Sequence, residues 1–158
     1  MALPIKGEIA LLYIHDGTIY RPLACLTSNS FNPSVSIIES NTKCNPGVTI
    51  KTAGMFNYTL EAEGEYIDTT SVGGDTTKAS HDYLFTKMTA KLPVTWKLDT
   101  GVTGVIYYGT GIITDLPLDQ GSGDDLSTFS ITIEGSGDVA KVDPKAWTSV
   151  FSQQFTNQ

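Results

Sequence analysis

The residue types that most often perform catalysis are few in this sequence and lie far apart. His15 and His81 do not have the spacing of metal ligands. Cys25 and Cys44 are separated by eighteen residues and belong to no Cys-x-x-Cys motif, which leaves a zinc site with little support. The sequence contains neither the Gly-x-Ser-x-Gly elbow of serine hydrolases nor the Walker loop of nucleotide-binding proteins. We therefore expect no catalytic residues, no cofactor and no metal site.

A glycine pair and an acidic segment are the remaining candidates for a ligand site. Gly109 and Gly111 form a Gly-x-Gly, but the third glycine of a dinucleotide site is missing and the neighbours are strand-forming residues. A bulge or a close backbone contact is the better interpretation. Residues 115–125 contain several aspartates that could coordinate calcium, but their spacing fits neither an EF-hand nor a glycine-rich nonapeptide repeat. We interpret this segment as a solvated hairpin loop.

Length and charge restrict the class of protein. A chain of 158 residues, 40% of them hydrophobic, is sufficient for one domain with a single core. Its net charge of −7 argues against a protein that holds nucleic acid by neutralising phosphates. No secretion signal is recognisable, and the apolar run at residues 9–14 is far too short to span a bilayer. We expect a protein that folds in the cytoplasm with reduced cysteines and does not bind a membrane.

The pattern of the first third of the chain predicts strands. Residues 8–15 form an apolar run followed by Asp16-Gly17, a dipeptide typical of a type I′ hairpin turn, so residues 18–26 are expected to form the return strand. Within residues 48–63 apolar and polar side chains alternate, which is the pattern of a strand with one buried face. These segments indicate an antiparallel β protein.

Residues 27–46, between those strands, are rich in Ser, Asn and Pro. This composition predicts a long loop, with at most a short strand at residues 35–38. A loop of this length inside a compact domain is unusual and often belongs to an interface.

The second half of the domain predicts one helix and three strands. Residues 80–91 have a serine cap, an acidic first turn and a basic last turn, which favour a helix. Strands are expected at residues 94–99, 105–116 and 126–134. Several alternating strands need a second layer to bury their apolar faces, so the predicted fold is mainly β: an antiparallel β-sandwich with one flanking α-helix.

The chain after Gly137 has a different character. Asp143-Pro144 is typical of a helix start, and aromatic residues follow it at helical spacing. A short helix and a docking arm fit this tail equally well. We therefore divide the chain into a domain at residues 1–137 and a C-terminal arm at residues 138–158.

Two segments resemble a known family. The sequence Gly109-Thr-Gly-Ile-Ile-Thr-Asp-Leu-Pro-Leu, the acidic pair Asp124-Asp125, and Leu126-Ser-Thr-Phe-Ser-Ile-Thr-Ile-Glu-Gly-Ser-Gly137 are similar to the C-terminal signature of the major tail tube proteins of long-tailed bacteriophages. The order of elements in the front half also resembles that family, so the similarity covers residues 5–137. The apolar tail has no counterpart in the family pattern.

The resemblance implies a structural virion protein without enzymatic activity. Tail tube proteins form hexameric rings in which an inner sheet of each subunit joins an inter-subunit β-barrel around a channel for DNA. The rings stack head to tail. The implied partners are further copies of the chain and other tail proteins (tape measure, tail terminator and distal tail), whereas DNA passes without specific binding. The implied location is the virion tail, after assembly in the host cytoplasm.

Three groups of residues would then mediate assembly. Strand alternation assigns to the channel wall the polar residues Asn57, Thr59, Glu61, Glu63, Ser130, Thr132 and Glu134. The long loop offers as ring-stacking residues Asn32, Pro33, Ser34, Glu39, Asn41 and Lys43. The tail offers Trp147, Phe151 and Phe155, which we expect to dock on the same subunit or a neighbour because monomers seldom expose a large apolar stripe.

Two other function classes fit the sequence less well. A carbohydrate-binding β-sandwich could stack sugar rings on Trp96, Tyr107 or Trp147, but Trp96 shares its predicted apolar face with Val94 and Leu98. A metal-dependent hydrolase would need a clustered set of histidines and aspartates that the sequence does not contain.

Overall fold

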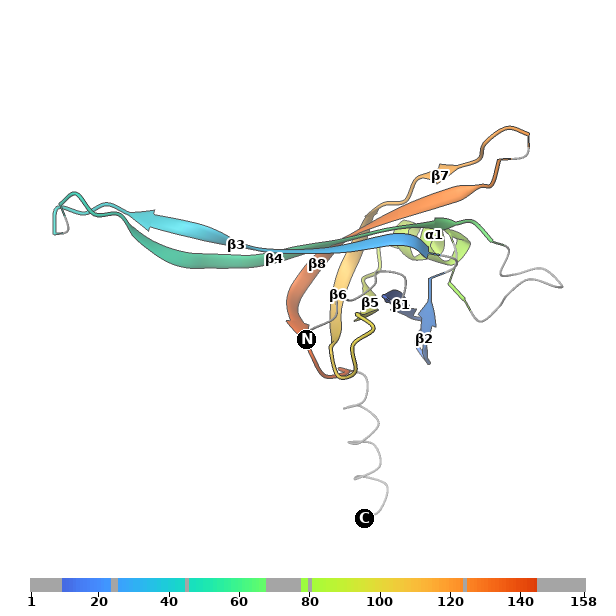
Figure 1. The fold of residues 1–158 in the computed structure, drawn as a ribbon, viewed down its shortest axis with the longest axis horizontal. Coiled ribbons are helices and arrows are strands. Elements are labelled where there is room, and N and C mark those ends of the chain that lie inside the picture. The colour runs from blue at the N-terminus through green and yellow to red at the C-terminus, as the bar shows by residue number, and fades with distance from the viewer. Residues whose placement is uncertain are drawn as a thin grey trace, which may run out of the picture.

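A computed structural model describes residues 10–23, 26–44, 46–67, 78–79, 81–123 and 125–144 (Figure 1). The described strands form one antiparallel eight-stranded sheet in the order β2-β1-β5-β6-β8-β4-β3, with β7 paired to β8. In chain order the elements are β1 (Leu11–His15), β2 (Tyr20–Pro22), β3 (Leu26–Ser40), β4 (Ile50–Glu65), α1 (His81–Thr89), β5 (Val94–Asp99), β6 (Ile106–Asp115), β7 (Leu118–Asp119) and β8 (Thr128–Ala140).

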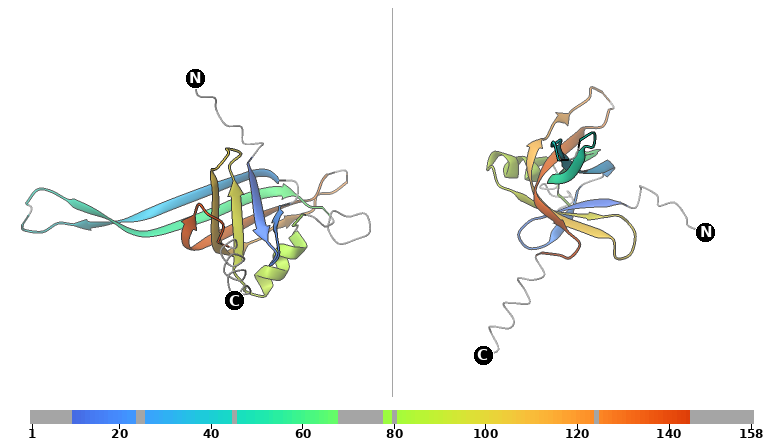
Figure 2. Two further views of the ribbon diagram at one scale, coloured as in Figure 1. Left: turned by 90° about the horizontal axis from the view of Figure 1, so that it is seen from below. Right: turned by 90° about the vertical axis from the view of Figure 1, so that its left-hand side faces the viewer.

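The sheet bends over itself, so that its two halves enclose one hydrophobic core (Figure 2). Trp96 on β5 packs against Tyr58 on β4 with ring centres 5.4 Å apart, although the two strands are not neighbours in the sheet. The register between β6 and β8 shifts twice, which indicates irregular pairing at the bend. Within the described residues the mainly β fold with one helix is therefore confirmed, and the two layers arise from one continuous sheet.

The expected close backbone contact at Gly109 and Gly111 is present at this bend. A Cβ added at Gly109 would lie 2.6 Å from the Trp96 ring, and one added at Gly111 would lie 2.5 Å from the Ile133 side chain. The Tyr58 hydroxyl fills the remaining space: it donates to the Thr110 carbonyl at 2.7 Å and accepts from Trp96 Nε1 at 3.3 Å. Burial raises the pKa of Tyr58, so its hydroxyl stays a donor.

The first hairpin forms as predicted, but its turn is different. His15 pairs with Tyr20, so that four residues, not two, connect β1 and β2. The Asp16 carboxylate accepts the amides of Thr18 and Ile19, each at 2.8 Å. Only Gly17 in this turn has a positive φ, at 101°, whereas a type I′ turn requires two such residues. The side-chain hydrogen bonds of Asp16 replace that geometry.

The prediction of a long loop at residues 27–46 is wrong. Leu26–Ser40 is the fifteen-residue strand β3, which pairs with β4 from Leu26↔Gly64 to Ser40↔Ile50. The two strands project far beyond the rest of the sheet (Figure 1). Because β3 is an edge strand that is exposed along most of its length, it has no need of a hydrophobic alternation, and it tolerates Pro33.

The other expected elements are present with small shifts. The helix α1 has Asp82 in its first turn and Lys87 in its last, and it buries Leu84. Lys91, with a φ of 57°, follows its end. Strand β8 continues to Ala140 and thus crosses the boundary drawn at residue 137. Within the described residues no helix has the length and apolar character needed to cross a bilayer.

Candidate assembly surfaces: an acidic sheet face and a projecting arm

One face of the sheet collects all seven residues predicted for a channel wall. Their neighbours in the two strands, such as Leu60 (1% exposed) and Ile133 (0% exposed), point into the core. Thr59 lies opposite Glu134, Glu61 opposite Thr132 and Glu63 opposite Ser130, so the two strands present one continuous polar surface. We call this surface the acidic face; its members are Asn57, Thr59, Glu61 and Glu63 of β4 with Ser130, Thr132 and Glu134 of β8.

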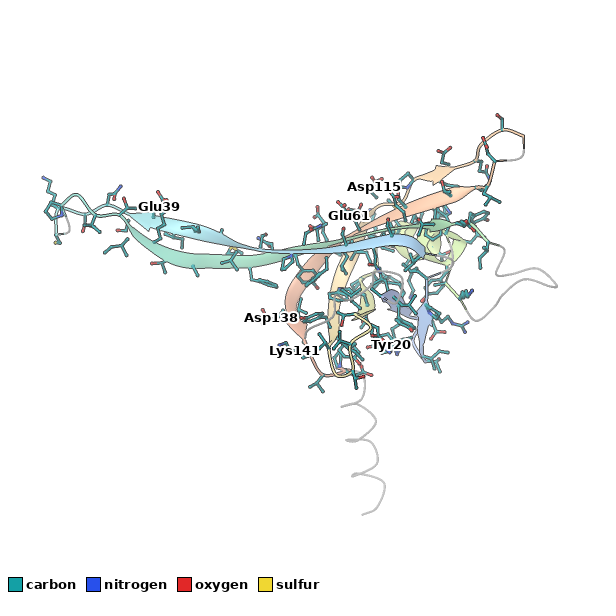
Figure 3. The ribbon with its side chains drawn as sticks, viewed as in Figure 1. Tyr20, Glu39, Glu61, Asp115, Asp138 and Lys141 are labelled. Atoms are coloured by element: carbon teal, nitrogen blue, oxygen red, sulfur yellow. The ribbon has the colours of Figure 1, made fainter. Side chains whose placement is uncertain are left out.

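The acidic face contains carboxylates and neutral polar groups. Glu61, Glu63 and Glu134 are all exposed. The sequence has no lysine or arginine between Lys97 and Lys141, which includes the whole of β6, β7 and β8. Figure 3 shows Glu61 and Asp115 on the side of the sheet that faces away from Tyr20. The surface is therefore negative without a nearby compensating cation on those strands.

Two sheet edges flank the acidic face. β3 is the last strand in the order, and along Leu26–Ser40 its outer edge has no partner among the described strands. On the other side, β6 pairs with β5 only as far as Gly111, so residues 112–115 pair with β8 alone. Among the described strands, β7 also pairs only with β8. Exposed edges of this kind present unpaired backbone groups that can pair with another chain.

The second surface is the part of the β3–β4 hairpin that extends beyond the rest of the domain, residues 34–57. We call this part the arm and the rest of the domain the body. β4 pairs with β8 only from Thr59 onward, so the arm is a two-stranded ribbon. A bulge interrupts it where Ser36 lies opposite Gly54 and Met55, and the Ser36 hydroxyl accepts the Met55 amide at 2.8 Å. The ribbon nevertheless carries many exposed apolar side chains: Val35, Ile37, Ile38, Val48, Ile50, Met55 and Phe56.

The predicted stacking residues are distributed along this arm. Asn32, Pro33 and Ser34 lie at its base in β3, Glu39 lies near its far end, and Asn41 and Lys43 lie in the connection. All six are exposed. Glu39 pairs with Lys51 at 3.4 Å, but both side chains are more than half exposed, so this ion pair contributes little to stability. Sequence reasoning missed the apolar residues, although Ile37-Ile38 in a polar segment was a signal for them.

The C-terminal residues Trp147, Phe151 and Phe155 lie outside the described residues. The chain is described as far as Pro144, and Asp143 Oδ1 accepts a hydrogen bond from the Tyr20 hydroxyl at 2.8 Å. This contact holds the end of the described chain against β2.

The residues with potential chemistry serve the fold. His15 Nδ1 accepts the Gly17 amide at 2.9 Å in the first turn. His81 Nε2 lies 3.2 Å from the Leu116 carbonyl, and its ring stacks on Phe85. Trp96 is 0% exposed, so it is not available to a sugar ring. Within the described residues no three His, Cys, Asp or Glu side chains are grouped closely enough to hold a metal ion.

Comparison with known proteins gives similarity in structure but not in sequence. No protein-family model and no curated protein matches the chain. A chain from the tail of an empty GTA particle, solved with C6 symmetry, superposes with a TM-score of 0.72 at 12% identity, covering 87% of this chain and 98% of that one. A chain of the SPP1 tail tube superposes with a TM-score of 0.59 at 10% identity, covering 85% of this chain and 77% of that one.

A chain from a contractile injection system is also similar in structure. A chain of the PVC sheath–tube complex, an extracellular contractile injection system, gives a TM-score of 0.56 at 16% identity, covering 87% of this chain and 90% of that one. The resemblance to tail tube proteins seen in the sequence is thus confirmed at the level of structure, and nothing in these similarities favours a carbohydrate-binding module. The chain has the fold of subunits that build the GTA tail and the SPP1 tail tube.

Proposed function

We propose that this chain is a tail tube subunit, which assembles into hexameric rings that stack into a tube for the passage of DNA. The observation that supports this most directly is the acidic face, flanked by two unpaired edges, on the fold of the SPP1 tail tube. Its role is structural and not enzymatic. It acts in the virion tail, next to other tail proteins, after assembly in the host cytoplasm.

The ring closes when the two free sheet edges of neighbouring copies pair with each other. The outer edge of β3 in one copy pairs with residues 112–115 of β6, together with β7, in the next copy. Each subunit then contributes four strand positions, β3, β4, β8 and β6–β7, to a continuous barrel. Barrels of roughly 16–18 strands already enclose an aqueous channel, so a barrel built from six such sheets encloses a wide one. Closure removes the exposed edges that would otherwise aggregate.

The acidic face then lines the channel. Ring symmetry turns each of Glu61, Glu63 and Glu134 into a circle of negative charge. Such a wall repels phosphate groups, because the carboxylates and the phosphates are both negatively charged. It also offers no lysine or arginine to neutralise a phosphate, which is what DNA binding depends on. DNA moves through the channel without being held.

Ring stacking uses the arm. Its exposed apolar side chains, Ile37 (62%) and Met55 (75%) among them, would be costly to leave in water, so the arm packs on a copy in the adjacent ring. The contact is heterologous, because the arm of one copy meets a different surface of the next, and such contacts generate filaments.

Negative-stain microscopy of the concentrated full chain tests this function. We expect rings or tubes with a central channel. A variant that lacks residues 35–55 should still fold, because the arm contributes no fully buried side chain to the core, but it should not form tubes. Featureless monomers of the full chain at every concentration would contradict the proposed function, and normal tubes of the shortened variant would contradict the role of the arm alone.

A further inference from the structure

The outer surface of the β2–β1–β5–β6 half of the sheet gathers three tyrosines around one lysine. Tyr13 lies opposite Lys97, and Lys97 lies opposite Tyr108, so these side chains share one face. Lys97 Nζ lies 4.6 Å from the ring centre of Tyr13 and 5.7 Å from that of Tyr20. The rings of Tyr20 and Tyr108 are 5.9 Å apart. We call these four side chains the tyrosine face.

The tyrosine face points away from the core. Leu12, Ile14 and Trp96, which alternate with its members on β1 and β5, are at most 1% exposed and point inward. Tyr13, Tyr20, Lys97 and Tyr108 are only partly buried. Tyrosine is enriched among the residues that anchor protein interfaces, because its ring offers a large contact area at low entropic cost. Neither the acidic face nor the arm includes this surface.

The described chain ends beside this face. The Tyr20 hydroxyl donates to Asp143 Oδ1 at 2.8 Å, in a partly buried contact. Burial, followed by the nearby Asp143 carboxylate, raises the pKa of Tyr20, so the hydroxyl remains protonated and keeps donating. The fourteen residues 145–158 continue from this anchor, and they include Trp147, Phe151 and Phe155.

We propose that the tyrosine face is the docking site for residues 145–158 of the same chain. A segment of fourteen residues spans roughly 45 Å when extended and roughly 21 Å as a helix. The face is four strands wide, or roughly 14 Å, so either conformation reaches across it. Because Asp143 tethers the segment at the edge of the face, its effective concentration there far exceeds that of a segment from another molecule.

The chemistry of the two partners is complementary. Indole and phenyl rings pack on tyrosine rings in tilted or offset arrangements, and the Lys97 ammonium offers a cation–π contact for which tryptophan is the best acceptor. Docking also removes from water the apolar stripe that Trp147, Phe151 and Phe155 would otherwise expose. The proposal does not depend on the tube function, since it concerns the single subunit.

Acrylamide quenching of tryptophan fluorescence in the full chain tests the proposal, at concentrations where sedimentation shows a monomer. The chain has two tryptophans, and Trp96 is 0% exposed. A Trp147→Phe background isolates Trp96, so the difference between the two proteins gives Trp147. We expect Trp147 to be protected in the unmodified chain and several-fold more quenchable in a Tyr13→Ser/Tyr108→Ser variant. In the Trp147→Phe background the same tyrosine changes should leave quenching unaltered.

A milder variant keeps the test decisive if the double variant misfolds, which easy quenching of Trp96 would reveal. Tyr20→Phe keeps the ring and removes only the hydroxyl that holds Asp143. It should accelerate trypsin cleavage after Lys145, followed by mass spectrometry. Two results would overturn the proposal. One is free quenching of Trp147 by acrylamide in the unmodified chain, and the other is protection of Trp147 that stays the same in both tyrosine variants. Protection that appears only at concentrations above the monomer range would mean that the segment docks on another copy, and would overturn it as well.

Discussion

Strands β3 and β4 run through two regions, the body and the arm, in which their side chains are buried differently. In the body, β4 alternates strictly, with Leu60 1% exposed and Glu61 exposed. In the arm the same strand leaves Met55 75% exposed and Ile50 45% exposed. The difference arises because the opposite half of the sheet covers one face of the body, whereas no described residue covers the arm. Alternation therefore indicates that a face is covered within the chain, and the exposed apolar residues of the arm are the ones that the proposed ring stacking would cover.

The largest effect on stability should come from the core of the body. Trp96→Ala removes a ring that is 0% exposed and contacts Tyr58 and Phe31, so it should lower the free energy of unfolding by about 3–5 kcal/mol. Urea denaturation followed by circular dichroism measures this. Thr95→Ala, the adjacent residue on the outer face of β5, is the matched control and should cost below about 1 kcal/mol. Equal losses in both variants would contradict the assignment of the two faces.

Changes in the arm should have the opposite profile. Ile37→Asp/Met55→Asp should change the free energy of unfolding by no more than about 0.5 kcal/mol, because both side chains are mostly exposed in the monomer. It should abolish tubes in electron micrographs, because docking would bury two carboxylates in an apolar contact. Ile19→Asp alters an apolar residue of the first hairpin that is also more than half exposed, and this variant should assemble normally. Tubes of normal length from the arm variant would show that the arm does not stack.

The same contrast explains how much could be predicted from the sequence. Strands with one covered face, such as Val94–Asp99, were located closely, and the seven residues of the acidic face were assigned to a common side by alternation alone. Strand β3 was missed because apolar and polar residues do not alternate along it. The edges that flank the acidic face depend on which strands pair across the whole chain, and local sequence does not determine that. The contact between Tyr20 and Asp143 joins residues 123 positions apart and left no local signal.

A smaller effect, visible only in assembled protein, should come from the acidic face. Glu61→Lys/Glu134→Lys places cations on two exposed positions without touching the core. We expect tubes that retain DNA at low salt and release it as salt rises, since each new phosphate contact adds roughly 0.9 to the slope of log K against log salt. Asp138→Lys, an exposed change on β8 outside the acidic face, is the control and should retain less DNA (Figure 3). Equal retention by both variants would mean that these strands do not line the channel.

The smallest expected effect concerns the first turn, where a charged side chain, Asp16, accepts several hydrogen bonds. The Asp16 carboxylate accepts hydrogen bonds from Arg21 and from the amides of Ile19 and Thr18, and these hold the pKa of Asp16 far below its usual range. A carboxyl group whose pKa is lowered by folding stabilises the protein above its unfolded pKa of about 3.9, and this contribution is lost as pH falls toward the folded value.

Asp16→Asn retains the shape of the side chain but loses the charge, so it should lower the free energy of unfolding by about 1 kcal/mol at neutral pH. The gap between the two proteins should narrow steadily as the pH falls below about 4, because the aspartate of the unmodified chain then gains a proton on unfolding. Glu39→Gln is the matched control: its ion pair with Lys51 is exposed at both ends, and its effect should be close to zero at every pH. Parallel urea-denaturation curves at several pH values measure both variants. A gap for Asp16→Asn that stays constant from neutral pH to pH values well below 4 would mean that the hydrogen bonds of this turn do not depend on the carboxylate charge.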